Sequence, residues 1–577
     1  MHYSQNLGKN STAVCVFLFV LAFALRLIGL DYGYFHGDER VNDAARVLTG
    51  ELIPSQHFYP PFVHYLNATA LGGLFGTGLL AGWWSGPGGF REAYFTDPTP
   101  FYVTLRALTA LTSAIMAPLF YIAARKLTLS QWPAVIVALT AVFMPLSVFM
   151  AHIAKGDTGL AVAMIATFVA LMMRLDTTKP LRWDLLLGLC VALTMSYKHS
   201  AIFVLGPLAV GTIVLIARQE GWAKAFMSFG RALLPIVILW PLLNIGLILD
   251  FQNFLDFQKI QGVMSLRPDD ISPFAGILTL THKASQMSFG MTPVIAVMAV
   301  LTPAGLLSRH CTLAQKPTLM VIWLSLCVGS LAVAYITGPR QPEHLWIANF
   351  AGYTLLASMV FANLSQAALP LLRYGSGLAI AAGLALSIWA TGIVQTQAIA
   401  PTNLAQVAAF LETHTQDNRD STKIIADIPL PLPQKTAAIL DEEKRAERLA
   451  EKYQITLPPR AEERLQSVEP TNALYHRRLP EVMFGLENTK DGDLAFPIKA
   501  HAWPPQTEEW QLEHWRAQQI TLFVLKDFET YAASPRPKLR QDFYQSIGTN
   551  CQLLAQFDTL KPLFLEREIH VFDCSAP

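Results

Sequence analysis

Charged residues are scarce in this sequence of 577 residues. Asp, Glu, Lys and Arg make up 15% of the chain and hydrophobic residues 52%, whereas soluble domains carry about 25% charged residues. The deficit indicates a membrane protein, and the net charge of +1 does not favour nucleic-acid binding. The long apolar runs stop near residue 393, and the chain beyond is polar and mixed. We therefore predict a polytopic helical membrane body over residues 1–396 and a soluble C-terminal domain over residues 397–577.

Motifs of several common enzyme classes are missing. The sequence has no GxGxxG, no Walker loop, no HExxH and no GxSxG, so neither a nucleotide-phosphate cradle nor a serine nucleophile elbow is predicted. Six cysteines are present without a CxxC pair, which argues against a structural zinc site. Cys551 and Cys574 lie in the polar C-terminal part. In an oxidising compartment they would form a disulfide, and two free thiols are the alternative.

Eleven apolar segments predict membrane spans, which need about 20 residues each. Two of them, on either side of Ser196–Ser200, are short. The segments are Ser11–Leu30, Tyr102–Ala124, Trp132–Met150, Thr158–Met173, Trp183–Met195, Ala201–Ala217, Ala232–Leu249, Met291–Leu307, Leu319–Ile336, Leu345–Ala362 and Ser376–Val394.

A twelfth segment, Tyr65–Trp84, is rich in glycine and ends in WWSGPGG. Cytoplasmic loops carry an excess of Lys and Arg, and tryptophans favour the membrane interface. If this segment does not cross and the N-terminus is cytoplasmic, every cytoplasmic turn is basic. The basic residues of those turns are Arg125, Lys126, Arg174, Lys179, Arg182, Arg218, Lys224, Arg231, Arg309, His310, Lys316 and Arg373. We therefore predict that Tyr65–Trp84 is an interfacial or re-entrant helix within an outer loop over residues 31–101, and that the C-terminal domain lies outside.

With this orientation, most polar segments between the apolar spans lie on the outer face of the membrane. The largest is Asp31–Tyr65, which holds nine ionisable residues from His36 to His64 beside the first span. An ionisable cluster at the mouth of a membrane bundle indicates a functional site. The segments predicted to join it are His152–Asp157, Ser196–Ser200, Asp250–Gly290, Gly338–His344 and the C-terminal domain.

The sharpest motif is His36-Gly37-Asp38-Glu39-Arg40. A carboxylate at a membrane surface can act as a general base on an acceptor hydroxyl. The alternative is structural, because Asp38 would also cap a helix beginning near Arg40. The nearby Tyr59-Pro60-Pro61-Phe62 fixes an extended turn before the interfacial helix.

Three outer turns carry cations suited to a phosphate. Lys155 and Asp157 could bind a phosphate and orient a substrate or metal, or they could form an ion pair with Asp157 capping the next helix. Lys198 could bind an anionic headgroup or snorkel to the interface. Arg340 suits bidentate phosphate contact, and a salt bridge to Glu343 is its alternative.

The C-terminal domain is predicted to be a small α/β domain. It begins with an amphipathic helix, Asn403–Thr413, and a charged helical segment follows at Asp441–Gln466. Four strands are predicted, the last two as an antiparallel pair. They are Lys423–Asp427, Thr521–Lys526, Leu553–Phe557 and Glu568–Phe572.

These motifs together resemble the polyprenyl-phosphate-sugar-dependent glycosyltransferases of the GT-C fold, which include protein O-mannosyltransferases and aminoarabinose transferases. Asp38-Glu39 and Tyr59–Phe62 resemble the first outer loop of that superfamily, although Tyr59 stands where a His is usual. His152–Asp157 resembles its second outer segment, with Gly156 where the family often has Pro. Ser196–Ser200 is similar to its Thr-Lys turn and Gln341–Ala351 to its late outer segment. The soluble tail is also similar to that of bacterial and archaeal members.

The resemblance implies a cell (inner) membrane hexosyl- or pentosyltransferase that acts on the periplasmic or extracellular side. It would move a sugar from a polyprenyl-phosphate donor to a glycan, lipid or protein acceptor. Asp38 would be the catalytic base with Glu39 supporting it. Substrate would be bound by His36, Tyr59, Lys155, Asp157, Lys198 and Arg340. Some members use a divalent metal, for which His36, Asp38 and Asp157 could supply ligands. The alternative function is a transporter or flippase of lipid-linked sugars, for which an internal repeat and midspan charges would be typical.

Overall fold

The structure is a computed structural model of the full chain. It describes residues 9–32, 37–57, 59–127, 129–265, 291–337, 343–454, 469–480, 506–534, 538–558 and 568–575. Two compact units are present. The membrane body comprises Met1–Asp31, Phe35–Phe90 and Pro98–Ile399, and the second unit is mainly Ala400–Pro577.

The described residues of the membrane body form helices joined by turns and short loops, with no β-strand among them. Its α-helices are α1 (Lys9–Leu27), α2 (Val41–Leu48), α3 (Phe62–Ala81), α4 (Pro87–Thr96), α5 (Thr99–Ala114), α6 (Met116–Lys126), α7 (Gln131–Val142), α8 (Pro145–Met150), α9 (Asp157–Arg174), α10 (Pro180–Tyr197), α11 (Ile202–Glu220), α12 (Trp222–Leu243), α13 (Ile245–Leu249), α14 (Phe251–Ser265), α16 (Pro293–Leu307), α17 (Lys316–Thr337), α18 (Ile347–Leu364) and α19 (Pro370–Ile399). Three 3₁₀ turns join them: η1 (Gly37–Glu39), η2 (His199–Ala201) and η3 (Glu343–Trp346).

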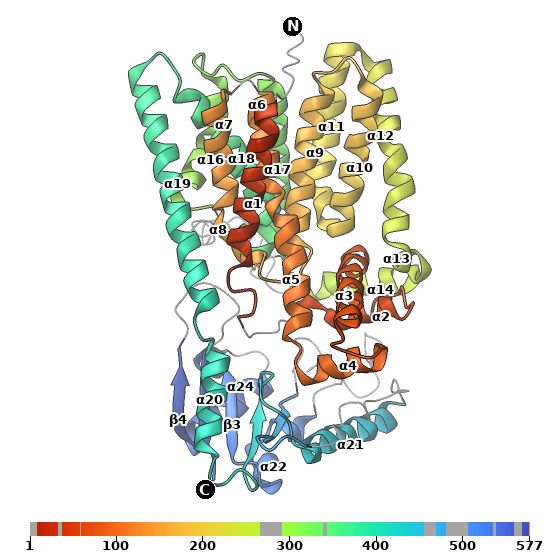
Figure 1. The fold of residues 1–577 in the computed structure, drawn as a ribbon, viewed down its shortest axis with the longest axis vertical. Helices are drawn as coiled ribbons and strands as arrows, with labels where there is room; N and C mark the ends of the chain where they lie inside the picture. Colours follow the sequence, from red (N-terminus) through yellow and green to blue (C-terminus); the bar gives the residue numbers. More distant parts are fainter. Residues whose placement is uncertain are drawn as a thin grey trace. The chain divides into compact units, whose positions relative to one another are not determined.

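Every predicted span corresponds to helix in the structure. Among the residues that the structure describes, seven helical segments are long and apolar enough to cross a membrane, and three shorter apolar helices accompany them. The remaining predicted span, Trp183–Met195, lies in α10, which packs between α9 and α12. Successive spans run up and down the bundle in alternation (Figure 1). The described parts of the predicted outer turns therefore meet at one end of the body.

Helices α9 and α18 form the centre of the bundle. In each of these helices, 89% of the most apolar 18-residue stretch is buried within the protein, whereas the value for the peripheral α12 is 6%. Glycine and alanine recur along both helices, and small residues allow close helix contact. Gly159 shows this directly, because a Cβ there would lie 2.1 Å from the Tyr197 ring. The start of α9 and the turn before α18 are consequently held by the most tightly packed part of the body.

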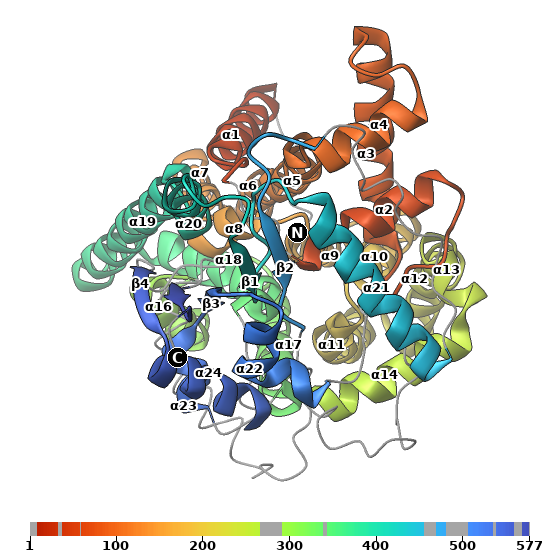
Figure 2. The same cartoon turned by 90° about the horizontal axis from the view of Figure 1, so that it is seen from below.

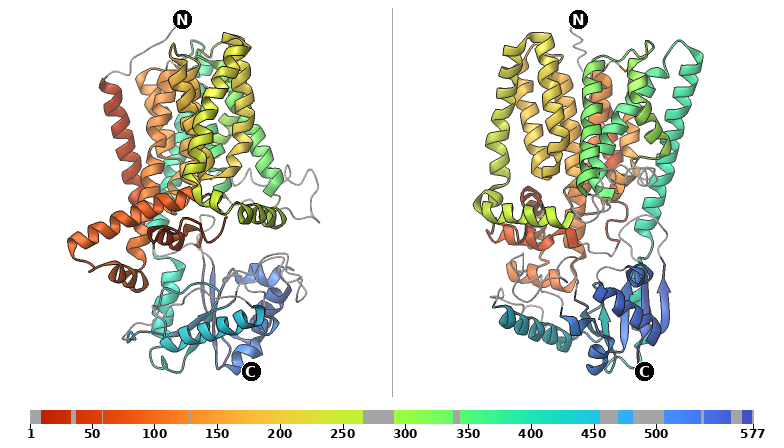
Figure 3. Two further views of the ribbon diagram at one scale, coloured as in Figure 1. Left: turned by 90° about the vertical axis from the view of Figure 1, so that its right-hand side faces the viewer. Right: turned by 180° about the vertical axis from the view of Figure 1, so that it is seen from behind.

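Helix α3 differs from the spans. It lies across the direction of the bundle helices (Figure 3) and is not among the segments apolar enough to cross a membrane. It ends at Gly82, which adopts a left-handed conformation with φ 72°. Leu80 and Trp83 just before and after this end are strongly exposed, as expected of a helix lying at a membrane surface. The orientation agrees with the predicted interfacial helix.

The C-terminal unit is an α/β domain, as predicted. Its helices are α20 (Asn403–His414), α21 (Thr436–Tyr453), η5 (Thr507–Trp510), α22 (Leu512–Ala517), α23 (Phe528–Ala533) and α24 (Lys538–Asn550). Its strands are β1 (Lys423–Ala426), β2 (Tyr475–Arg478), β3 (Leu522–Lys526), β4 (Gln552–Phe557) and β5 (Ile569–Asp573). The charged segment predicted at Asp441–Gln466 is helical to Tyr453, and its residues 455–466 lie outside the described residues.

The strands form one sheet in the order β2-β1-β3-β5-β4 (Figure 2). Strands β2, β1 and β3 are parallel, and β5 is antiparallel to both β3 and β4, so the predicted antiparallel pair is confirmed. Helix α20 covers one face of the sheet and α22, α23 and α24 cover the other. Strand β2 was not predicted, because its sequence YHRR is too polar and too short to stand out.

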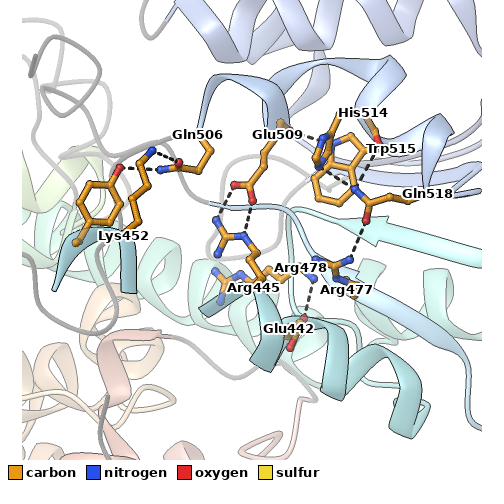
Figure 4. A network of polar contacts seen from close by, with 11 residues as sticks. Glu442, Arg445, Lys452, Arg477, Arg478, Gln506, Glu509, His514, Trp515 and Gln518 are labelled. Atoms are coloured by element: carbon orange, nitrogen blue, oxygen red, sulfur yellow. Dashed lines mark hydrogen bonds and ion pairs between the residues drawn. The ribbon is translucent and has the colours of Figure 1, made fainter. Parts of the chain in front are cut away.

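Two features tie this domain together. Cys551 and Cys574 form a disulfide at the edge of the sheet, which settles the alternative that the sequence left open. On the side of α21, a polar network joins that helix to β2, η5 and α22 (Figure 4). Its strongest link is the bidentate pair of Arg445 and Glu509, with two N–O distances of 2.6 Å and the carboxylate almost fully buried.

Candidate active site

A buried ion pair fixes the position of the Asp38-Glu39 turn. The Glu39 side chain has no solvent exposure, and its two oxygens accept bonds from Nε and Nη2 of Arg106, each at 2.8 Å. The backbone N–H of Ala154 donates to the same carboxylate at 2.9 Å. Arg106 also donates to the carbonyl of Leu30 at the end of the first span. One carboxylate therefore ties η1 to α5 and to the turn before α9.

Asp38 is the more exposed of the two acidic residues in the Asp38-Glu39 turn. Its side chain is 33% exposed, and its Oδ2 lies 2.9 Å from Nζ of Lys155, a residue 117 positions away. The Tyr59 hydroxyl donates to the same oxygen at 3.3 Å, and the Lys155 ammonium lies 5.3 Å from the centre of the Tyr59 ring. Burial raises the pKa of Tyr59, so this phenol keeps its proton and acts as a donor. Three predicted residues from two separate outer segments thus meet in one place.

A second ion pair lies directly behind the first. Asp157, which is 1% exposed at the start of α9, accepts a bond of 2.8 Å from Nζ of Lys198. Its other oxygen lies 3.7 Å from Nζ of Lys155. The Tyr197 ring packs on Gly159 and edge-on against Phe62, which sets the position of the neighbouring Lys198. Both lysines predicted to bind phosphate are therefore held within one cluster.

Lys155 is the centre of the cluster. Its side chain is only 3% exposed, and Nζ also donates to Nε2 of His344 at 3.2 Å. An ammonium only donates, so this contact requires His344 to be neutral, with its proton on Nδ1. Burial lowers the pKa of Lys155, but Asp157, Tyr59 and Asp38 raise it by more, so its net pKa lies above the ordinary value. Lys155 therefore remains a cation, and two lysines balance two aspartates.

The structure decides between the alternatives that the sequence left open. The N-cap of α2 is Arg40 and not Asp38, and the Arg40 side chain makes no capping bond. No side chain caps α9 either, which excludes capping by Asp157 but retains its ion pair. Lys198 is paired with Asp157 rather than snorkelling alone. His36 and Arg340 lie outside the described residues, and their substrate-binding roles stay predictions.

Sequence reasoning missed two members of the site. Arg106 lies inside an apolar segment, and a charge within a membrane span is itself a signal of function or of a buried partner. His344 was included in an outer turn but was not singled out, since a lone His carries little information. Its contact with Lys155 depends on η3 and α18 returning to the same end of the body.

Residues 16–262 match the profile of the family described as Dolichyl-phosphate-mannose-protein mannosyltransferase. The matched part is similar to this mannosyltransferase family. The match includes Asp38, Tyr59, Lys155 and Lys198 and confirms the resemblance predicted from the outer-loop motifs. The chain is therefore a glycosyltransferase with several membrane-spanning helices, and the match does not point to the transport alternative. No curated protein matches the chain significantly.

The chain is also similar to several solved structures, each at low sequence identity. ArnT from Cupriavidus metallidurans bound to undecaprenyl phosphate is 11% identical, with a TM-score of 0.48, over 96% of this chain and 97% of that chain. The S. cerevisiae Pmt1-Pmt2 protein O-mannosyltransferase complex bound to the sugar donor is 16% identical, with a TM-score of 0.34, over 43% and 35%. The oligosaccharyltransferase AglB from Archaeoglobus fulgidus, in complex with an inhibitory peptide and a dolichol-phosphate, is 12% identical, with a TM-score of 0.42, over 93% and 72%.

The divalent metal considered from the sequence would need ligands from His36, Asp38 and Asp157. Among the residues that the structure describes, no three His, Cys, Asp or Glu side chains gather as a metal site. Asp38 and Asp157, two of the predicted ligands, are each paired with a lysine. The third predicted ligand, His36, lies outside the described residues, so the metal stays a prediction.

Proposed function

We propose that this chain transfers a hexosyl or pentosyl group from a polyprenyl-phosphate donor in the membrane to an acceptor on the outer face. The observation that carries the proposal is the contact of Asp38 with Lys155 within the part of the chain that matches the mannosyltransferase profile. It places a partly exposed carboxylate beside a buried, permanently charged ammonium. A base and a phosphate ligand are the two groups that such a transfer needs.

The chemical step is a direct displacement at the anomeric carbon of the sugar. The acceptor oxygen forms a bond to this carbon while Asp38 takes the acceptor's hydroxyl proton. The bond from the anomeric carbon to the phosphate oxygen breaks, and polyprenyl phosphate leaves with the electron pair. In this proposal Lys155, supported by Lys198, stabilises the charge that develops on this phosphate. A single displacement inverts the configuration of the anomeric carbon.

Glu39 takes a different part in this proposal from the one predicted. Both of its oxygens are occupied by Arg106, and it has no exposure through which to meet a substrate. We therefore assign it to positioning Asp38 and not to the chemistry. Tyr59 helps to hold Asp38, and Asp157 holds Lys198.

The outer location rests on two observations. The basic turns lie at the end of the body opposite the cluster, as the positive-inside rule requires of a cytoplasmic face. The Cys551–Cys574 disulfide in the C-terminal unit suits an oxidising compartment such as the periplasm or the cell exterior. Together they support an inner-membrane enzyme whose chemistry occurs outside the cytoplasm.

Sugar transfer in proteoliposomes tests the proposal. A panel of polyprenyl-phosphate sugars is supplied with candidate lipid, glycan and peptide acceptors, and wild type is compared with Asp38→Asn. We expect one donor to be consumed by the wild type and turnover to fall at least about 100-fold in Asp38→Asn, the lower range for losing a general base. Equal turnover by the two proteins would refute the role of Asp38. Movement of intact donor across the bilayer without transfer would support the transport alternative.

A further inference from the structure

Within the described part of the cluster, both lysines that could meet the incoming donor phosphate are already paired with an aspartate. Asp38 and Asp157 each accept a hydrogen bond from a lysine, and His344 accepts another from Lys155. The two lysines and two aspartates sum to zero formal charge. The Lys155 ammonium has three donors, and Asp38, Asp157 and His344 lie around them, so a phosphodiester, which brings one negative charge, gains an ionic contact with Lys155 by replacing one of these partners.

The partners of Lys155 differ in how readily they can be replaced. Asp157 is 1% exposed and is fixed on its other side by Lys198 at 2.8 Å. His344 offers a neutral acceptor, which does not compete electrostatically with a phosphate. Asp38 is charged, is 33% exposed, and lies on a three-residue turn. Among the described partners of Lys155, Asp38 is therefore the one that a phosphate from the membrane side can displace.

We propose that the donor phosphate exchanges with the Asp38 carboxylate at Lys155, so that donor binding releases Asp38 to act on the acceptor hydroxyl. This inference rests on the proposed function and adds a control step to it. A carboxylate held by an ammonium is a weak proton acceptor, because the pair stabilises the charged form. The base consequently becomes effective only when a donor occupies the site. An acceptor that arrives without a donor is therefore not deprotonated.

The same exchange accounts for release of the lipid product. After transfer, Asp38 carries the acceptor's proton and is neutral, so it cannot compete with the polyprenyl phosphate at Lys155. Once the proton passes to solvent, the carboxylate returns and competes with the phosphate again. Loss of this proton would therefore favour product release and restore the resting ion pair.

The exchange makes an unusual prediction about binding. Removing a catalytic carboxylate normally leaves ligand affinity unchanged or weaker, whereas here Asp38→Asn removes a competitor of the phosphate. We expect Asp38→Asn to lower the Kd for farnesyl phosphate in nanodiscs about tenfold, which corresponds to about 1.4 kcal/mol. Farnesol, which lacks the phosphate, should bind both proteins equally. Lys155→Met should raise the Kd, and adding Asp38→Asn to it should have no further effect, because the two residues act through one contact.

Asp250→Asn is the matched control. Asp250 lies in the membrane body as well, is 22% exposed and is paired through its Oδ2 with His57 at 2.6 Å instead of with a lysine. Its neutralisation changes the net charge as Asp38→Asn does and should leave the Kd for farnesyl phosphate unchanged. Equal tightening by both variants would overturn the exchange in favour of a general charge effect. Should Lys155→Met not fold, the comparison of Asp38→Asn with Asp250→Asn still decides.

The binding and transfer assays separate this inference from the proposed function. If Asp38→Asn abolishes transfer while its Kd is unchanged or raised, the exchange is overturned and the base role is retained. If Asp38→Asn transfers sugar at the wild-type rate, the proposed function itself is refuted. Tighter binding together with lost transfer supports both.

Discussion

Replacing Glu39 with Gln separates a positioning role from a catalytic one. The substitution keeps the shape of the side chain but removes the charge that balances Arg106, which has no solvent exposure. Breaking a buried ion pair by removing one partner costs about 3–5 kcal/mol, because the remaining charge stays buried and uncompensated. We expect the free energy of unfolding of the membrane body to fall by about 3 kcal/mol. Transfer should fall as well, by about 100-fold if η1 shifts by roughly 1 Å.

Thermal unfolding in detergent, followed together with transfer kinetics, measures both effects. Glu51→Gln is the matched control, since Glu51 forms a bidentate pair with Arg46 at 2.6 and 2.5 Å but is 52% exposed. Exposed pairs contribute less than about 1 kcal/mol, so this control should unfold nearly as the wild type does. The contrast between two pairs of similar geometry isolates the effect of burial.

A double substitution, Glu39→Leu with Arg106→Met, completes the test. Replacing a buried ion pair with apolar side chains is often neutral or stabilising, so much of the lost stability should return. Transfer should not return, because Asp38 would still lack its anchor to α5. Full stability of Glu39→Gln combined with a pure loss of turnover would refute the positioning role and place Glu39 in the chemistry.

Three further predictions concern other parts of the chain. Burial raises the pKa of Asp427 to about 6, so the folded domain holds a proton that the unfolded chain releases near pH 3.9. The free energy of unfolding should therefore decline as the pH rises from about 4 to about 6. Asp427→Asn should become more stable than the wild type by up to about 3 kcal/mol between pH 4 and pH 7, as measured by pulse proteolysis of the full chain. Replacing both Cys551 and Cys574 with Ser should destabilise the C-terminal unit by about 3 kcal/mol, the chain-entropy value for a separation of 23 residues, seen as faster hydrogen exchange in β5; unchanged exchange would contradict it. Gly159→Ala should lower transfer, because its Cβ would overlap the Tyr197 ring beside Lys198, whereas Gly206→Ala, which meets nothing within 4 Å, should not.

The course of the chain through the membrane could be predicted from hydropathy and the positions of basic residues. All eleven spans are helical, and α3 lies across the bundle as the positive-inside rule required. These predictions succeed because a membrane demands long apolar helices, which leave a strong sequence signal. The strand β2 left none, since four polar residues at the edge of a sheet carry no periodicity.

The site could be predicted in composition but not in connectivity. Asp38, Lys155, Asp157 and Lys198 were expected at one face, and the structure brings them together. Which carboxylate meets which cation depends on the packing of α5, α9 and α18, and helix packing is not encoded in spacing along the chain. For the same reason Glu39 was expected beside Asp38 in the chemistry, whereas its true partner is Arg106, 67 residues away.

The cluster combines ion pairs of two kinds, and the difference suits its proposed task. The Glu39–Arg106 pair is buried at both ends, and in the Asp157–Lys198 pair the carboxylate is buried and the lysine is 17% exposed. Pairs of this kind are costly to separate, so they fix the turn and the start of α9. The Asp38–Lys155 pair is buried only at its lysine, and water or a substrate oxygen can compete for its carboxylate. A site built in this way keeps its cation in place while its base remains exchangeable, as a transferase needs when its donor phosphate and its acceptor hydroxyl arrive separately.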